Sequence, residues 1–589
     1  MPRPAAEPGE GSLAASKWKF LWGDQRSWRQ RLALAGLAAL APPLLIICFG
    51  FLDTFAHNAA DFPFSLRELL APTLALGGIV WAVGAAGLMA LRGRVFDIAV
   101  SLLAGLAVAA WVEANLIGVK FGQLTGAAVD WPRYKAQALA NTAIWLALLA
   151  LPLALRLMGA KVWRAGVIAG PALVVAMSAA GLAGDNLGSA NLWQDKTANK
   201  LVSYQGAFSL SGTQNSYFFL LDMLDQVNIE AVAAAEPGLL EANLDGFTEF
   251  ENYVSRYSKT QPSAVNLLTG WDYLYDADWP AFTRQAYAES DFLHQLRQAG
   301  YSTNIYATER YSWSSPSDIE AVADNVTGGQ IRIDQAVVVK GMAKLAALRY
   351  APLVVKPSFW FDSSDFDAAA AVEAGPAPYA NDDPALMALV GAEGLAVASD
   401  QPRFSYFHLN GSHPPYTMDR DGRALPAAAQ GNQLDQTIGA LKIVFAYLDR
   451  LRELGLYQDA TIVITGDHGN FWTDADGGHL NEMSLPGPAR TALLVKPAGS
   501  AGAPLAYSKA PVAGDNIRAE FLRSAGLESS EGAVSLFEVP EGAARPRTYY
   551  HRRVAGESHP VQSVEQWEVL GDAADWSNWR LVREFETPH

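Results

Sequence analysis

The sequence predicts a chain in two parts, an N-terminal domain of five transmembrane helices and an extracytoplasmic α/β domain. Three observations carry this prediction. The first third of the 589 residues is strongly apolar, and the remainder has the mixed composition of a soluble domain. In that remainder, short apolar strands alternate with longer amphipathic stretches. A chain of this length is also too long for a single hydrophobic core.

Five apolar segments approach or exceed the roughly 20 residues that a membrane-spanning helix needs. All five are rich in Ala, Leu and Gly, and Pro42 and Pro43 are expected to kink the first of them. The segments are residues 32–52, 69–91, 96–117, 136–157 and 165–182. Glu113 lies inside the third segment near its outer end, where a charge is costly unless it has a function or reaches water.

The distribution of Lys and Arg predicts the orientation of these spans. Basic residues gather before the first span and in the links after the second and fourth spans. Such residues favour the cytoplasmic side, so the N-terminus is expected in the cytoplasm. Five spans then place the α/β domain on the outer side.

Charge and cysteine content exclude several classes of function. The net charge is −16 and the pI is near 5.1, which argues against nucleic-acid binding because that needs a basic face. The chain has one cysteine, Cys48, within an apolar run. Disulfides within the chain and CxxC zinc sites are therefore excluded.

Shifts in composition divide the chain into four expected segments. Residues 1–183 form the five-span domain, and the polar, Asn/Ser-rich residues 184–212 form a membrane-proximal linker. Residues 213–512 form the α/β domain. Residues 513–589 form a C-terminal subdomain that contains Trp567, Trp576 and Trp579 but no evident motif.

Four apolar runs in the second part are predicted to be strands of a largely parallel sheet. They are residues 216–221, 302–307, 404–409 and 460–465, and a helix is expected over residues 434–454 before the last of them. In such sheets the chemistry gathers at the carboxyl ends of the strands.

Metal-ligating side chains follow these strands. Asp222 comes directly after the first strand, His413 follows the third, and Asp467 and His468 follow the fourth. Thr260 lies in an intervening loop. Each residue alone has an ordinary explanation as a cap, a turn, a packed histidine or a loop threonine. Together they make a set of oxygen and imidazole ligands suited to Zn²⁺ or Mn²⁺, with Mg²⁺ as a further candidate.

The phrase SKTQPSAVNLLTG at residues 258–270 matches the pattern C-x-P-S-R followed by x-x-L-x-T-G, with Thr260 at the cysteine position. On this phrase and the strand-end residues, the second part resembles the sulfatase-like branch of the alkaline phosphatase superfamily over about residues 216–497. The whole arrangement resembles lipoteichoic acid synthase and the phosphoethanolamine transferases of the bacterial cytoplasmic (inner) membrane. The resemblance implies a periplasmic sulfatase-like α/β domain.

The resemblance also implies roles for individual residues. Asp222, Thr260, Asp467 and His468 correspond to ligands of a divalent metal ion, and Thr260 also corresponds to the nucleophile. His413, in the phrase GSHPPY, corresponds to a histidine on the substrate side. His479 is a further candidate, although its spacing from His468 differs from that of the transferases.

Three departures from the sulfatase pattern favour phosphate over sulfate chemistry. Thr260 replaces the cysteine that sulfatases convert to formylglycine, and Ala264 replaces their arginine. Asp222 is followed by Met223 rather than by a second aspartate. Arg256 and Lys259 are candidates for the missing cation.

The sequence therefore predicts a membrane-bound phosphotransferase. It would move phosphoglycerol or phosphoethanolamine from a phospholipid donor, through phospho-Thr260, to an envelope glycan or lipid acceptor. Three alternatives remain, namely a metal-dependent phosphodiesterase or phosphatase, a non-catalytic membrane regulator, and a true sulfatase.

Overall fold

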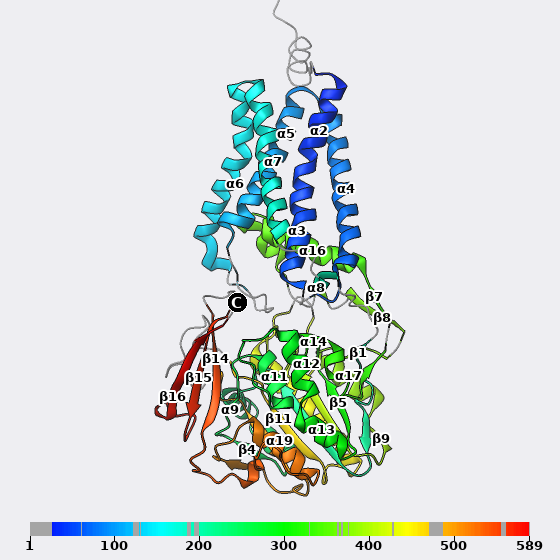
Figure 1. The fold of residues 1–589 in the computed structure, drawn as a ribbon, viewed down its shortest axis with the longest axis vertical. Helices are drawn as coiled ribbons and strands as arrows, with labels where there is room; N and C mark the ends of the chain where they lie inside the picture. The colour runs from blue at the N-terminus through cyan, green and yellow to red at the C-terminus, as the bar shows by residue number, and fades with distance from the viewer. Residues whose placement is uncertain are drawn as a thin grey trace, which may run out of the picture. The chain divides into compact units, whose positions relative to one another are not determined.

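The computed structural model of the chain describes residues 26–59, 62–119, 121, 129, 131–184, 190–193, 200–328, 330–361, 365–366, 369–374, 376–426, 429–470, 487–554 and 561–587. The chain divides into two compact units (Figure 1). The first unit consists of residues 1–120, 128–198 and 331–371, and the second of residues 121–127, 199–330 and 372–589.

The first unit contains the five long apolar helices that the sequence predicts. Each is long and apolar enough to cross a membrane: Trp28–His57, Leu66–Ala90, Gly93–Ile117, Trp131–Met158 and Ala160–Gly184. Their parts are α2 (Trp28–Pro43), η1 (Leu44–Phe49), α3 (Gly50–His57), α4 (Leu66–Ala90), α5 (Gly93–Val112), η3 (Glu113–Ile117), η4 (Trp131–Tyr134), α6 (Lys135–Leu155), η5 (Arg156–Met158) and α7 (Ala160–Gly184). Helices α2, α4, α5, α6 and α7 run side by side as a bundle (Figure 1).

The first apolar helix is irregular at the two prolines. Helix α2 ends at Pro43, and η1 continues it as a π-helix before α3 resumes α-helical geometry. Proline lacks the N–H that the regular hydrogen-bond ladder needs, so the ladder is interrupted there. The irregularity expected at Pro42 and Pro43 is therefore a π-helical stretch.

A segment from the second half of the sequence belongs to the first unit. It contains α16 (Gln335–Tyr350) and η6 (Leu353–Phe359). In chain order, the element of this unit that precedes it is α8 (Ala190–Trp193). Helix α16 packs against α3 and α4. The ring of Phe366 lies edge-on to that of Phe62 at a centroid distance of 5.0 Å, and Arg349 forms an ion pair with Asp53. The sequence analysis did not foresee this segment.

Glu113 is fully buried in this unit and does not reach water. Its Oε1 lies 2.8 Å from Nζ of Lys356 in η6. Its Oε2 accepts hydrogen bonds from Nδ2 of Asn141 at 2.6 Å and from Nε1 of Trp145 at 3.1 Å. Oδ1 of Asn141 accepts the backbone N–H of Leu353 at 2.9 Å. An ion pair and two hydrogen bonds thus compensate a buried carboxylate and attach η6 to α5 and α6.

The second unit is built on a seven-stranded mixed sheet of order β13-β4-β12-β11-β3-β10-β5. Strands β11, β3, β10 and β5 are parallel to one another, as the sequence predicts, and β12 is antiparallel to both of its neighbours. The strands are β3 (Asn215–Leu221), β4 (Thr248–Phe250), β5 (Ser302–Tyr306), β10 (Arg403–Leu409), β11 (Thr461–Thr465), β12 (Leu493–Lys496) and β13 (Ala506–Ser508).

Helices cover both faces of this sheet. Side chains along each strand point alternately to the two faces, so one strand can pack against helices on both. Phe218 of β3 packs against Phe521 of α19 on one face. Its neighbours Tyr217 and Phe219 pack against Tyr447 of α18 on the other. The helices of the second unit are α9 (Gln226–Ala235), α10 (Leu239–Asn243), α11 (Thr260–Thr269), α12 (Trp279–Ala288), α13 (Asp291–Gln298), α14 (Glu309–Ser312), α15 (Pro316–Ile319), α17 (Asp383–Glu393), α18 (Gln433–Glu453), α19 (Gly514–Ser524), η9 (Leu536–Glu538) and η10 (Trp576–Asn578).

A separate antiparallel sheet forms the end of the second unit. Its strands are β14 (Arg547–Val554), β15 (Val561–Val569) and β16 (Trp579–Glu586). Trp567 and Trp579 of this sheet pack with Tyr549, Val254 and Ala489 in one buried cluster.

The remaining described strands form three two-stranded sheets: β1 (Leu201–Val202) with β6 (Val326–Thr327), β2 (Ser209–Ser211) with β9 (Ala396–Ser399), and β7 (Gln330–Ile333) with β8 (Ala370–Ala374).

The buried Glu113–Lys356 pair predicts a non-additive effect on stability. Lys356→Met should lower the free energy of unfolding by about 3–5 kcal/mol, because it leaves an uncompensated buried carboxylate. Adding Glu113→Gln should recover most of that loss, since no buried charge remains. Thermal unfolding of the full chain in detergent measures both effects. A double variant as unstable as Lys356→Met alone would contradict this account.

Glu249 of β4 predicts a dependence of stability on pH. Burial, together with the charges of Glu251 and Glu230, raises the pKa of its carboxyl group from 4.5 to about 7. The folded state therefore favours the protonated form, and stability is lost as the pH rises from about 4.5 through about 7. Glu249→Gln should be more stable than the parent at pH 8, by up to about 3 kcal/mol, and similar to it at pH 4.5. Melting temperatures of the parent, of Glu249→Gln and of the control variant Glu289→Gln at both pH values test this. A change in the melting temperature of Glu249→Gln that is equal at the two pH values would refute it.

Candidate active site

The strand pairing brings the proposed site residues together. Leu221 at the end of β3 pairs with Leu409 at the end of β10, and Thr465 at the end of β11 pairs with Leu220. Because these strands are parallel, their carboxyl ends meet at one edge of the sheet. Asp222 follows β3 directly, and Asp467 follows β11 after one residue.

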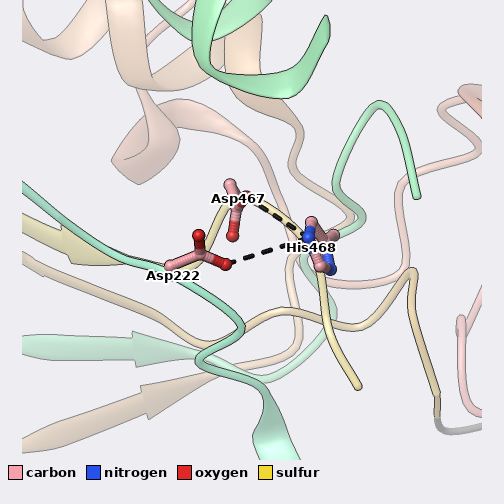
Figure 2. Close-up of side chains that lie close together, drawn as sticks. All are labelled: Asp222, Asp467 and His468. Atoms are coloured by element: carbon pink, nitrogen blue, oxygen red, sulfur yellow. Dashed lines mark ion pairs between the residues drawn. The ribbon is translucent and has the colours of Figure 1, made fainter. Parts of the chain in front are cut away.

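Asp222, Asp467 and His468 form one buried cluster of metal-ligating atoms, with a ligand atom of each within 4.8 Å of the others. Nε2 of His468 lies 3.5 Å from Oδ2 of Asp467 and 3.9 Å from Oδ1 of Asp222. Figure 2 shows the three side chains pointing toward one another. Each residue is at most 2% exposed, so two carboxylates share a small space from which water is excluded.

Two carboxylate oxygens of this cluster, together with the ring of His468, are suited to a divalent cation. Among the described residues, Oδ1 of Asp222 and Oδ2 of Asp467 accept no hydrogen bond although both atoms are buried. Nδ1 of His468 lies 2.8 Å from the carbonyl oxygen of Gly469, which can only accept, so Nδ1 carries the proton. This tautomer leaves the lone pair of Nε2 facing the carboxylates, as metal ligation requires.

Neighbouring histidines keep Asp222 ionised. Burial raises the pKa of its carboxyl group, but the electrostatic influence of His413, His408 and His468 outweighs burial and lowers that pKa to about 2. The residue after Asp222, Met223, has a φ of 59° and donates its backbone N–H to Oδ1 of Asp467 at 3.0 Å. A non-glycine residue in this region is strained, and such residues cluster at functional sites.

Thr260 lies beside this cluster, at the first position of a helix. Thr260 was predicted to lie in a loop, and that prediction was wrong, because α11 begins at Thr260 and ends at Thr269. Pro262 is tolerated in the first turn, and Gly270, with a φ of 80°, ends the helix in the left-handed conformation. Oγ1 of Thr260 lies 3.2 Å from Nε2 of His468 and 3.4 Å from Oδ2 of Asp222. The structure thus brings the nucleophile candidate to the metal-ligand candidates.

The loop after β10 packs tightly against Asp222. The backbone carbonyl of Asp222 accepts the N–H of Ser412 at 2.8 Å. Gly411 has a φ of 57°, and a side chain there would meet the backbone nitrogen of Asp222 at 2.6 Å. Only glycine allows this close approach, and His413 follows two residues later in the same loop.

Histidines supply the remaining polar groups. His413 is half-buried, and its Nδ1 is hydrogen-bonded to the carbonyl of Pro414, so Nε2 is left for other contacts. His408 of β10, which the sequence analysis missed, is fully buried with Nε2 3.7 Å from Oδ2 of Asp222. Its signal was a histidine near the end of an apolar strand. His479 lies outside the described residues.

Of the two cations considered near the nucleophile, one is engaged elsewhere. Nε of Arg256 donates to Oδ1 of Asp272 at 2.8 Å, and its guanidinium lies over the ring of Tyr550. Lys259 directly precedes Thr260. Burial and the charge of Arg552 lower the pKa of its ammonium group to about 8, while Asp222 and Asp467 act in the opposite direction.

The described residues thus place a buried hydroxyl beside a carboxylate–histidine cluster at the strand ends of a helix-covered sheet. The family model described as Sulfatase matches residues 225–527, which is more than half of the chain. The chain belongs to the sulfatase family. Thr260, His413, Asp467 and His468 all lie within the matched range.

Several solved structures can be aligned with this chain over most of their own length. The phosphonate monoester hydrolase SpPMH of Silicibacter pomeroyi is 15% identical, with 64% of this chain and 89% of that chain covered at a TM-score of 0.36. An alkaline phosphatase superfamily protein of Vibrio parahaemolyticus is 10% identical, with 66% and 85% covered at 0.37. The putative sulfatase yidJ of Bacteroides fragilis is 12% identical, with 64% and 90% covered at 0.35. A search among curated proteins finds no match.

The cluster predicts that metal binding depends on its carboxylates. Asp222→Asn and Asp467→Asn should each lower affinity for Zn²⁺ or Mn²⁺ by about tenfold or more, since each removes a charged ligand. Chelation should lower the melting temperature of the parent and have little effect on either variant. Calorimetric titration of the full chain, with the exposed Asp421→Asn as control, measures this. Unchanged affinity in both cluster variants would exclude the site.

Proposed function

We propose that the protein is a membrane-bound, metal-dependent phosphotransferase that uses Thr260 as its nucleophile. It takes the head group of a phospholipid, phosphoglycerol or phosphoethanolamine, and passes it to a glycan or lipid hydroxyl. The observation that carries the proposal is the buried Thr260 hydroxyl, 3.2 Å from His468 and 3.4 Å from Asp222 at the start of α11. Membership of the sulfatase family supports phosphoryl or sulfuryl transfer as the class of reaction.

The identity of residue 260 favours phosphate. The chain's single cysteine is Cys48, in the first apolar helix, so formylglycine cannot form at the nucleophile position. A threonine hydroxyl is a weak nucleophile at neutral pH and needs activation. A divalent cation held by Asp222, Asp467 and His468 would lower the pKa of that hydroxyl and offset the charge of the phosphate group.

The chain's own residues then have separate tasks. The deprotonated Oγ1 of Thr260 attacks phosphorus, and the bond from phosphorus to the diacylglycerol oxygen breaks. Nε2 of His413 gives a proton to that departing oxygen, because Nδ1 is already held by the Pro414 carbonyl. In the second half, the acceptor hydroxyl loses its proton to His413 and attacks phospho-Thr260, which restores the threonine.

The five apolar helices support a lipid donor. A chain anchored in the bacterial inner membrane keeps its site near the bilayer surface that holds the donor. The expected orientation places this site on the periplasmic side, where envelope glycans and lipids serve as acceptors.

Substitution of Thr260 tests the proposal. Thr260→Ala should lower release of diacylglycerol from head-group-labelled phospholipid vesicles by at least about a thousandfold, because the attacking oxygen is absent. Thr260→Ser should keep measurable activity. Thr269→Val, which removes a hydroxyl from the other end of α11, serves as the matched control. Full activity in Thr260→Ala would end the proposal, and label that passes to water with no preference for an acceptor would make the protein a hydrolase.

A further inference from the structure

The C-terminal sheet lies directly against the residues that lead into the nucleophile. The backbone N–H of Tyr550 donates to the carbonyl of Arg256 at 2.8 Å, and the N–H of Ser258 donates to the carbonyl of Tyr550 at 3.2 Å. The N–H of Arg552 donates to Oγ of Ser258 at 3.2 Å. Strand β14 therefore runs beside residues 256–258 and places Arg552 next to the segment that enters Thr260.

Stacked rings fix this alignment. The rings of Tyr257 and Tyr550 stack at a centroid distance of 5.1 Å. Val564 of β15 joins them in one buried cluster, and Tyr275 packs against it. Because both backbone and side chains hold β14 here, the position of Arg552 does not depend on its own side chain.

Arg552 differs from the arginines around it. Arg256 is bound by Asp272, and Nη1 of Arg553 donates to Glu584 at 2.5 Å. Among the described residues, the guanidinium of Arg552 forms no hydrogen bond and no ion pair, and its Nε is buried. A buried donor without a partner is costly. A cation kept in that state beside a catalytic centre is suited to an anionic ligand.

Lys259 connects the segment that lies beside Arg552 to the nucleophile candidate, Thr260. Lys259 directly follows Ser258, whose Oγ accepts the N–H of Arg552 at 3.2 Å, so the two cations lie on adjoining segments. It also directly precedes Thr260, whose Oγ1 lies 3.4 Å from Oδ2 of Asp222, so Lys259 is next in the chain to a residue that contacts the cluster. Two neighbouring cations repel each other, and an anion bound between them would relieve the repulsion.

We propose that Arg552, together with Lys259, binds the non-bridging oxygens of the donor's phosphate group. The C-terminal sheet would thereby contribute a substrate-binding residue to the active site. This inference rests on the proposed function of Thr260, and it names the cation that takes the place of the arginine replaced by Ala264. It also restricts the donor to compounds with an anionic phosphate.

Phosphate binding by three variants of the full chain tests this proposal. Arg552→Gln keeps the length of the side chain and removes its charge, and Arg552→Lys keeps the charge. Arg553→Gln is the matched control, because the neighbouring arginine is already paired with Glu584. The strand contact of residue 552 uses its backbone N–H, so all three variants should keep the fold; equal melting temperatures and equal metal content verify this.

The probe is inorganic phosphate, titrated into the metal-loaded protein in nanodiscs by calorimetry. Arg552→Gln should weaken phosphate binding by about tenfold or more, Arg552→Lys by about threefold or less, and Arg553→Gln not at all. With phospholipid as substrate, Arg552→Gln should raise KM and Arg552→Lys should restore it in part. Unchanged phosphate affinity in Arg552→Gln, or no phosphate binding by the parent, would overturn the inference.

This inference and the proposed function fail in different ways. If the parent transfers head groups and Arg552→Gln binds phosphate normally, the role of Arg552 is wrong and that of Thr260 stands. If Arg552→Gln loses phosphate affinity but the parent transfers nothing, the anion site stands and the transferase proposal is wrong.

Discussion

The parallel pairing of β3 with β10 and β11 is the constraint on which the active site depends. It brings residues from three distant parts of the sequence to one sheet edge, where Asp222 and Asp467 meet in a space closed to water. The apolar side chains of β3 pack on helices on both faces and hold this edge in place. Because the position of the ligands follows from strand register, a slip of one residue would turn each of these side chains to the other face.

Buried charge recurs in both units, and each unit compensates it differently. In the first unit, the ammonium group of Lys356 lies 2.8 Å from one oxygen of Glu113 and two hydrogen bonds reach the other, which suits a structural contact. In the second unit, Asp222 and Asp467 each retain a buried oxygen that accepts no hydrogen bond from the described residues, and neither carboxylate forms an ion pair with a lysine or arginine among them. Such incomplete compensation is costly unless a ligand supplies what is missing. The difference separates a charge that holds helices together from charges that hold a cation.

The local features of the second unit could be predicted from the sequence, and the long-range ones could not. The strands over 216–221 and 460–465 are apolar runs followed by acids, so both the elements and Asp222 and Asp467 were visible. The helix that begins at Thr260 was missed, since the phrase was interpreted as the nucleophile loop of the sulfatase pattern that it resembles. His408 was missed because a histidine within an apolar strand resembles a core residue. The contact of β14 with residues 256–258 depends on tertiary packing across nearly 300 residues, which no local pattern encodes.

The central claim is that Thr260 carries the transferred group, and mass spectrometry of the peptide that contains it is the most direct measurement. The metal-loaded full chain would be incubated with phospholipid vesicles without an acceptor, quenched in acid and digested. The account predicts an added phosphoglycerol or phosphoethanolamine on Thr260, which disappears when acceptor is supplied. An unmodified Thr260 peptide alongside continued release of diacylglycerol, or the adduct on another residue, would contradict it.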